Sequence, residues 1–155
     1  MIKFKELRLK NFTRLKDATI KFSTEPSKPL TLIFGPNGSG KTTVMRAITW
    51  ALHGTTNDPV FNTYKKLLNR DAQKNGDLYF SSTLIVEKTI VEKDGNKKNT
   101  LYEIVRSYDV KKGVSDPSND SDFEETLTVT KNGTSVPMAQ NQETIEKLFP
   151  KDLLD

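Results

Sequence analysis

The feature that most constrains this chain of 155 residues is a glycine-rich stretch, Gly-Pro-Asn-Gly-Ser-Gly-Lys-Thr-Thr, at residues 35–43. It fits the pattern G-x-x-x-x-G-K-[ST], in which glycines let backbone N–H groups approach phosphate oxygens closely. In that pattern Lys41 would bring its ammonium group to the β- and γ-phosphates, and the Thr42 hydroxyl would ligate Mg²⁺. The candidate nucleotide-binding residues in the loop are Gly35, Pro36, Asn37, Gly38, Ser39, Gly40, Lys41, Thr42 and Thr43.

The sequence on either side of this loop predicts a strand before it and a helix after it. Residues 30–34 are a short apolar run, which is typical of a buried strand. Gly54 stands where a glycine commonly ends a helix, so we expect a helix over residues 41–53. The apolar positions of this helix recur at helical spacing: Val44, Met45, Ile48, Ala51 and Leu52. The start of such a helix offers unpaired N–H groups to an anion.

The remainder of the chain predicts a β-rich domain with few helices. Alternating patterns and turn signals predict strands over residues 2–10, 18–22, 77–91, 101–110, 126–130 and 134–138. Turns are expected at Lys-Asp-Gly-Asn, residues 93–96, and at Asn132-Gly133. Residues 64–70 and 141–149 predict helices, the second ended by Pro150. The acidic and Pro/Ser-containing residues 111–125 predict a mobile loop.

Composition narrows the chemistry that the chain can perform. Cysteine is absent and His53 is the single histidine, which excludes a thiolate metal site, a histidine cluster and a histidine-based triad. The net charge of +4 permits nucleic-acid contact without requiring it. No apolar run reaches the length of about 18 residues that a membrane span needs, so we expect no membrane partner.

The first third of the chain resembles the N-terminal half of the SMC-type ATPases. This branch of the ABC ATPases includes the SbcC-like double-strand-break repair proteins, RecF-like proteins and the DNA phosphorothioation ATPase DndD. The resemblance is carried by segments 2–12, 17–22, 32–43 and 47–54, and more weakly by 143–154, which looks like the approach to the Q-loop in the DndD-like branch.

The resemblance implies an α/β P-loop NTPase fold with a mixed sheet and an antiparallel β-rich subdomain. Residues 1–155 would be the N-terminal ATP-binding lobe of an ATPase head, without the coiled coil and the C-terminal lobe. The family often has a basic residue directly after an Asn-Phe pair, and here Arg14 follows Asn11-Phe12 one place later. Arg14 is therefore a further candidate ATP-binding residue.

The resemblance also implies cofactors and partners for the whole protein, which we expect to be cytoplasmic. These are ATP and Mg²⁺, double-stranded DNA, a second ATPase head, and a nuclease or modification enzyme. The sequence lacks a Leu-Ser-Gly-Gly signature and an apolar strand ending in Asp-Glu. We therefore assign no catalytic residue, and we expect residues 1–155 alone to bind ATP weakly without hydrolysing it.

Other interpretations stay open at this point. The ATP-binding subunit of another ABC-type system and a non-catalytic nucleotide sensor carry such a loop, whereas a small-molecule kinase is disfavoured because residues 65–70 are too poor in arginine for its lid. The acidic residues 116–125 are candidate catalytic carboxylates or a solvated loop. The N-terminal cations form either a DNA-phosphate surface or the charged outer face of an edge of the sheet: Lys3, Lys5, Arg8, Lys10, Arg14, Lys16 and Lys21.

Overall fold

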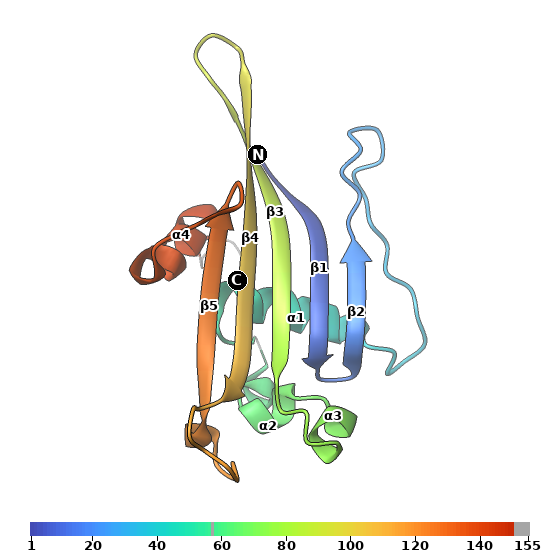
Figure 1. The fold of residues 1–155 in the computed structure, drawn as a ribbon. Helices are drawn as coiled ribbons and strands as arrows, with labels where there is room; N and C mark the ends of the chain where they lie inside the picture. Colours follow the sequence, from blue (N-terminus) through green and yellow to red (C-terminus); the bar gives the residue numbers. More distant parts are fainter. Residues whose placement is uncertain (57, 151–155) are drawn as a thin grey trace.

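The computed structural model describes residues 1–56 and 58–150, and it is built around one antiparallel sheet (Figure 1). The strand order is β2-β1-β3-β4-β5-β6. Every neighbouring pair in this order is antiparallel. The strands are β1 (Ile2–Phe12), β2 (Leu15–Lys21), β3 (Phe80–Val91), β4 (Lys97–Val110), β5 (Phe123–Lys131) and β6 (Thr134–Ser135).

The longest helix, α1 (Lys41–His53), crosses one face of this sheet behind β1, β3 and β4 (Figure 1). Two short helices, α2 (Tyr64–Leu67) and α3 (Arg70–Lys74), lie at the end of the sheet where β1 turns into β2. Helix α4 (Asn141–Leu148) lies beside β5. The single-turn helices are η1 (Pro59–Phe61), η2 (Asp120–Asp122) and η3 (Met138–Gln140).

The hydrophobic core lies between α1 and the sheet. Trp50 is 1% exposed, and its ring centroid lies 5.5 Å from that of Phe12 and 5.3 Å from that of Phe80. The buried Ser82 hydroxyl donates a hydrogen bond of 3.0 Å to the Ala47 carbonyl. Helix α1 is therefore fixed to β1 and β3, and this fixes the position of the loop that precedes it.

The structure confirms the mixed α/β fold and most of the elements predicted from the sequence. Helix α1 has the predicted bounds, and Gly54 ends it in the left-handed region (φ 71°) with its N–H bonded to the Trp50 carbonyl at 2.8 Å. Both predicted turns connect antiparallel strands, β3 to β4 and β5 to β6. In the part of the chain that is described, no helix has the length and apolar character to cross a membrane.

The predicted buried strand at residues 30–34 is wrong. Leu30, Leu32 and Phe34 are 70%, 61% and 84% exposed, and the segment pairs with no strand within residues 1–56 and 58–150. A strand needs a neighbour for its backbone N–H and C=O groups, and the described part of the chain offers residues 30–34 none. The parallel part of the expected mixed sheet is consequently absent from the described residues.

Several further boundaries differ from the sequence prediction; for example, the strand expected over residues 77–91 begins at Phe80, and the one expected over 134–138 ends at Ser135. The expected loop at residues 111–125 ends early, because β5 begins at Phe123, which is only 4% exposed. The expected helix at 64–70 is divided into α2 and α3, because the Asn69 side chain accepts from the N–H groups of Asp71 and Ala72 and starts a new helix. Residues 151–154, at the end of the stretch that resembles the approach to the Q-loop, lie outside the described residues.

Candidate nucleotide-binding site

The glycine-rich loop lies at the start of α1, next to the turn between β1 and β2. A cavity of about 360 Å³ opens at this place. Its lining residues are Thr13, Arg14, Asn37, Gly38, Gly40, Lys41, Thr42, Thr43, Arg46 and Phe61. Arg14 and most of the predicted loop residues thus share one cavity. Gly35, Pro36 and Ser39 do not line it.

The backbone of the loop has a shape that glycine alone adopts readily. Gly38 (φ 84°) and Gly40 (φ 102°) both lie in the left-handed region. A Cβ on Gly38 would come within 2.7 Å of the Arg14 guanidinium, and one on Gly40 within 3.1 Å of the Leu15 side chain. Glycine at these two positions therefore lets the Arg14 and Leu15 side chains lie close against the loop.

The first turn of α1 presents unpaired N–H groups to the cavity. Val44 is the first residue of α1 whose N–H finds a backbone acceptor, the Gly40 carbonyl at 3.2 Å. Gly40 caps the helix without a side-chain hydrogen bond. Among the described residues, the N–H groups of Lys41, Thr42 and Thr43 have no acceptor. Such groups at the positive end of a helix dipole bind anions, so this end of the cavity suits a phosphate group.

Lys41 is held by the loop itself. Its ammonium group donates to the carbonyls of Gly35 and, at 2.7 Å, of Pro36. The Ser39 N–H also donates a hydrogen bond of 3.2 Å to the Pro36 carbonyl, which closes a turn within the loop. Gly35, Pro36 and Ser39 thus shape the loop, although they do not line the cavity. An ammonium group with three donors on a flexible stem can exchange these carbonyls for phosphate oxygens.

The turn between β1 and β2 is fixed in a strained shape beside the loop. Thr13 has a φ of 48°, which is unusual for a β-branched residue. Its N–H donates to the Leu67 carbonyl at 2.6 Å, and its hydroxyl donates to the Thr43 hydroxyl at 2.9 Å. The Asn69 amide donates to its carbonyl at 2.8 Å. The next residue, Arg14, donates from Nη1 to the Gly38 carbonyl at 2.9 Å.

Thr13, Arg46 and Phe61 also line the cavity, and the sequence pattern did not lead us to expect them there. The Arg46 guanidinium lies 3.9 Å from the centre of the Phe61 ring and donates to the Asp58 carboxylate at 2.8 Å. Arg46 follows Thr42 by four residues, so the two lie on one face of α1, and this spacing was a usable signal. Phe61 carries no such signal, because η1 reaches the cavity only through the folded chain.

No acidic residue lines the cavity among the described residues. In the acidic run, Glu125 instead pairs with Arg106, and Asp122 accepts from the N–H groups of Ser118 and Asn119. Those hydrogen bonds hold the pKa of Asp122 below its ordinary value. The described residues contain no group of three or more His, Cys, Asp or Glu side chains that could hold a metal ion.

The predicted N-terminal basic surface is divided by the fold. Strand β1 lies between β2 and β3, so the edge-strand interpretation is wrong for its four cations, whereas Lys16 and Lys21 lie on the edge strand β2 as that interpretation expects. Arg8 pairs with Glu6 on the same strand, and the Lys10 ammonium lies 5.3 Å from the centre of the Tyr79 ring. Of the seven N-terminal cations, Arg14 alone lines the nucleotide cavity.

Comparison with known proteins agrees with the geometry of the loop. Residues 6–154 match the family described as AAA domain. The chain is 36% identical over 109 residues to the DNA double-strand break repair Rad50 ATPase of Archaeoglobus fulgidus, a match that covers 62% of this chain and 12% of that protein. It is 52% identical over 44 residues to the OLD nuclease of Thermus scotoductus, covering 28% of this chain and 7% of that protein.

Among solved structures, the fold resembles that of the recombination mediator protein RecF bound to ATP. The TM-score is 0.53 at 18% identity, and the alignment covers 87% of this chain and 28% of RecF. The chain therefore spans a small part of the relatives that it matches. The family match extends over nearly all of its own length, and the chain belongs to the AAA-domain family.

Proposed function

We propose that residues 1–155 are the N-terminal ATP-binding lobe of an ATPase head that acts on DNA in repair, processing or modification. The observation that carries this proposal is the loop geometry, with left-handed Gly38 and Gly40, free N–H groups at the start of α1, and two cations, Lys41 and Arg14, at its rim. A triphosphate needs this combination of close backbone approach and positive charge.

Within this site the residues would divide the work by chemistry. The N–H groups of residues 41–43 would surround the terminal phosphates, and Lys41 would leave its carbonyl partners for the β- and γ-phosphates. The Thr42 hydroxyl would ligate Mg²⁺, which supplies charge neutralisation on the phosphates when bound. Arg14 would add a second cation from the opposite side of Gly38.

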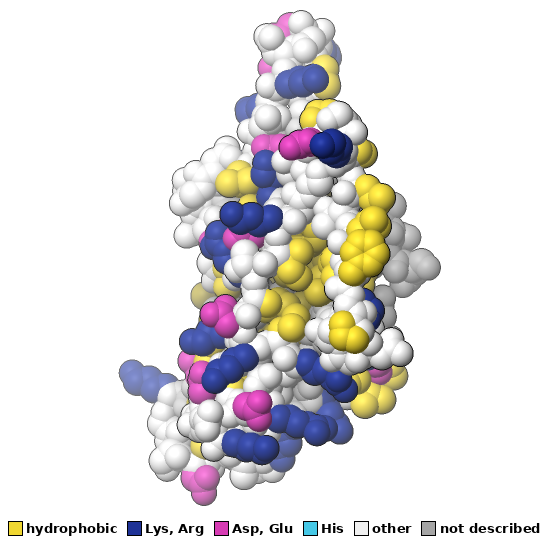
Figure 2. Space-filling view, turned by 90° about the vertical axis from the view of Figure 1, so that its right-hand side faces the viewer, with side chains coloured by type: hydrophobic (Ala, Val, Ile, Leu, Met, Phe, Trp, Pro, Cys, Tyr) yellow, Lys and Arg dark blue, Asp and Glu magenta, His cyan; other side chains and the backbone are white. Residues whose placement is uncertain are grey.

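The lobe would require a second part of the protein for hydrolysis. No carboxylate lines the cavity among the described residues, whereas hydrolysis needs one to orient the attacking water. The apolar residues before the loop support such a partner. Figure 2 shows an apolar patch on the face that carries β2, and the exposed apolar side chains between β2 and the loop are Leu30, Leu32, Ile33 and Phe34. We propose that residues 30–34 pair with a strand from the rest of the protein.

The partners follow from the relatives. The Rad50 relative is named for DNA double-strand break repair, and we propose duplex DNA as the macromolecular ligand. A second ATPase head is proposed as the dimer partner, and a nuclease or modification enzyme as a further one, with the complex working in the cytoplasm. These assignments depend on the relatives and not on the cavity.

Phosphate release from Mg-ATP by the complete protein tests the function. We expect turnover in the wild type and none above background in the Lys41→Ala variant, because the variant loses the ammonium that meets the β- and γ-phosphates. A non-catalytic nucleotide sensor is the second candidate, favoured by the lack of a carboxylate in the described cavity. ATP binding without turnover in the complete protein would establish the sensor and contradict the ATPase.

A further inference from the structure

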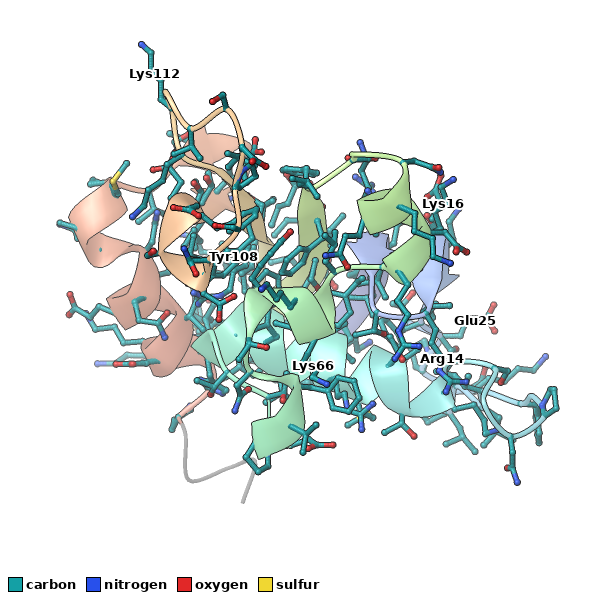
Figure 3. All side chains as sticks on the ribbon, turned by 90° about the horizontal axis from the view of Figure 1, so that it is seen from below. Arg14, Lys16, Glu25, Lys66, Tyr108 and Lys112 are labelled. Carbon is teal, nitrogen blue, oxygen red and sulfur yellow. The ribbon has the colours of Figure 1, made fainter. Side chains whose placement is uncertain are left out.

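A second cavity adjoins the nucleotide cavity at the end of the sheet where β1 turns into β2. Its volume is about 920 Å³, and Thr13, Arg14 and Phe61 line both cavities. Figure 3 looks at this end of the molecule and shows the labelled Arg14 and Lys66 on neighbouring elements. The other lining residues come from η1, α2 and α3 and the residues around them: Val60, Lys65, Lys66, Leu68, Asn69, Arg70, Asp71, Gln73 and Lys74.

The lining of this cavity is strongly basic. We call its five cations, Arg14, Lys65, Lys66, Arg70 and Lys74, the basic groove. The only carboxylate in the lining is Asp71, which lies 4.0 Å from the Lys74 ammonium. Within residues 1–56 and 58–150, the other four cations form no ion pair. Several unpaired positive charges around one concave surface raise the local concentration of anions.

Arginines elsewhere in the described chain differ from those of the basic groove. Arg8 pairs with Glu6, Arg46 pairs with Asp58, and Arg106 pairs with Glu125. A solvated charged face generally mixes both signs in this way. The basic groove does not, because its cations outnumber its carboxylate and most of them have no partner. Its charge is therefore available to an external ligand.

We propose that the basic groove binds the phosphate backbone of duplex DNA. Lysine and arginine are the side chains that neutralise backbone phosphates, and their contact does not depend on base sequence. Proteins that hold single strands also present rows of exposed aromatic side chains for base stacking. Phe61 is the only aromatic residue in this lining, and Arg46 lies over its ring. The groove thus fits a duplex backbone better than unstacked bases.

Arg14 gives the groove a direct connection to the nucleotide loop. It lines both cavities, and its guanidinium donates to the Gly38 carbonyl. A backbone phosphate that pairs with Arg14 would compete with this carbonyl and alter the loop that receives ATP. The identity of the ligand as DNA rests on the proposed function, whereas the position of the groove rests on its own charges.

The test is a salt titration of DNA binding by the complete protein, using a short fluorescein-labelled duplex of random sequence. The variant Lys66→Ala/Arg70→Ala removes two exposed cations that are outside the nucleotide cavity. Each phosphate contact contributes about 0.9 to the slope of log Kd against log salt concentration. We therefore expect the slope to fall by about 2 in this variant, with unchanged binding of a fluorescent ATP analogue.

Two matched variants make the result specific. Lys98→Ala/Lys112→Ala removes the same charge from exposed positions outside the groove, and it should leave the slope unchanged. Lys66→Arg/Arg70→Lys keeps both charges and should retain the wild-type slope. Equal slopes in the wild type and Lys66→Ala/Arg70→Ala would overturn the proposal that the basic groove binds DNA, even if the protein binds DNA elsewhere.

The remaining outcomes separate this proposal from the proposed function. If the wild type binds no duplex at low salt, the DNA assignment itself fails. If a polyglutamate peptide binds more tightly than the duplex, and Lys66→Ala/Arg70→Ala loses that binding, the groove belongs to an acidic protein partner and the DNA proposal is overturned. Tighter binding of a single strand than of the duplex, lost in the same variant, would overturn the choice of duplex.

Discussion

Gly38 is the residue at which the backbone of the proposed nucleotide loop and the Arg14 side chain come closest. Its φ of 84° suits glycine, and a Cβ there would lie 2.7 Å from the Arg14 guanidinium. That guanidinium donates a hydrogen bond to the Gly38 carbonyl. Backbone shape and side-chain charge therefore depend on each other at this position. Lys41 adds the second positive charge, and its ammonium group donates hydrogen bonds to the carbonyls of Gly35 and Pro36.

We predict that Gly38→Ala weakens ATP binding by at least about tenfold, because the left-handed φ disfavours alanine and the methyl group pushes the Arg14 guanidinium away from the Gly38 carbonyl; a cost of about 1.4 kcal/mol is tenfold in affinity. Binding of a fluorescent ATP analogue to the complete protein measures this. Gly95→Ala is the matched control, since Gly95 has a similar φ of 86° but nothing within 4 Å of its added Cβ. Equal loss in both variants would show that the effect is general strain.

Arg106 is the buried residue whose loss should cost most stability. It is 3% exposed and donates to the Ala51 carbonyl at 3.2 Å, to the Gln142 side chain at 2.9 Å and to Glu125. We predict that Arg106→Met lowers the free energy of unfolding by about 3 kcal/mol, because Glu125 and the end of α1 lose their partner. Urea unfolding measures it, and the exposed Lys147→Met should change little. A small effect at Arg106 would contradict this assignment.

Ionisation of the Tyr64 phenol is expected to lower the stability of the folded protein at alkaline pH. Burial raises its pKa above the ordinary value of 10.0, with a smaller contribution from Asp120, and its ring stacks on Phe123. The neutral phenol is favoured in the folded protein, so this stability is present below about pH 10 and is lost as the pH rises through the folded-state pKa. Tyr64→Phe should flatten the fall in melting temperature above pH 10, and an unchanged alkaline profile would contradict this.

The elements differ in how far the sequence could predict them. Helix α1 and the two hairpins follow from local signals, namely helical spacing that ends at Gly54 and turn residues such as Asn132-Gly133. Residues 30–34 have the pattern of a buried strand but lack a neighbour among the described residues. The apolar pattern indicates that a segment can be buried. A strand also needs a neighbouring strand for its backbone hydrogen bonds, and no local pattern predicts that neighbour.

The residues of the candidate site also differ in how far the sequence could predict them. The loop from Gly35 to Thr43 is contiguous, so its motif was sufficient to find it. Phe61 reaches the cavity from η1, and the basic groove joins the β1–β2 turn to α2 and α3. These contacts are set by tertiary packing, including the hydrogen bonds of Thr13 to Leu67 and Asn69, and no spacing in the sequence encodes them.

The exposed segment at residues 30–34 gives a prediction for this element. Leu32 is 61% exposed, so Leu32→Asp should leave the described sheet intact while it impairs pairing with the rest of the protein. We expect reduced ATP turnover in the complete protein with unchanged secondary structure by circular dichroism. Val91→Asp, at a position 62% exposed on β3, should retain turnover. Normal turnover in Leu32→Asp would contradict the proposed pairing.

The described residues combine a sheet that is antiparallel throughout with a glycine-rich loop at the start of α1. Helix α1 is held on the sheet through Trp50 and Ser82, so the loop and the β1–β2 turn meet in a fixed arrangement. The nucleotide cavity and the basic groove share Arg14 at this meeting point. The AAA-domain match and the loop geometry both support the proposed nucleotide site, and the basic groove that we propose for DNA lies beside the same loop.

Calorimetric titration of Mg-ATP into the complete protein and its Lys41→Ala variant tests the central claim most directly. The loop geometry predicts saturable binding by the wild type and a loss of at least about tenfold in affinity in Lys41→Ala, because a charge-assisted hydrogen bond to phosphate contributes about 1.5–3 kcal/mol. No binding by the wild type, or equal binding by both proteins, would contradict the assignment of residues 35–43 as the nucleotide site.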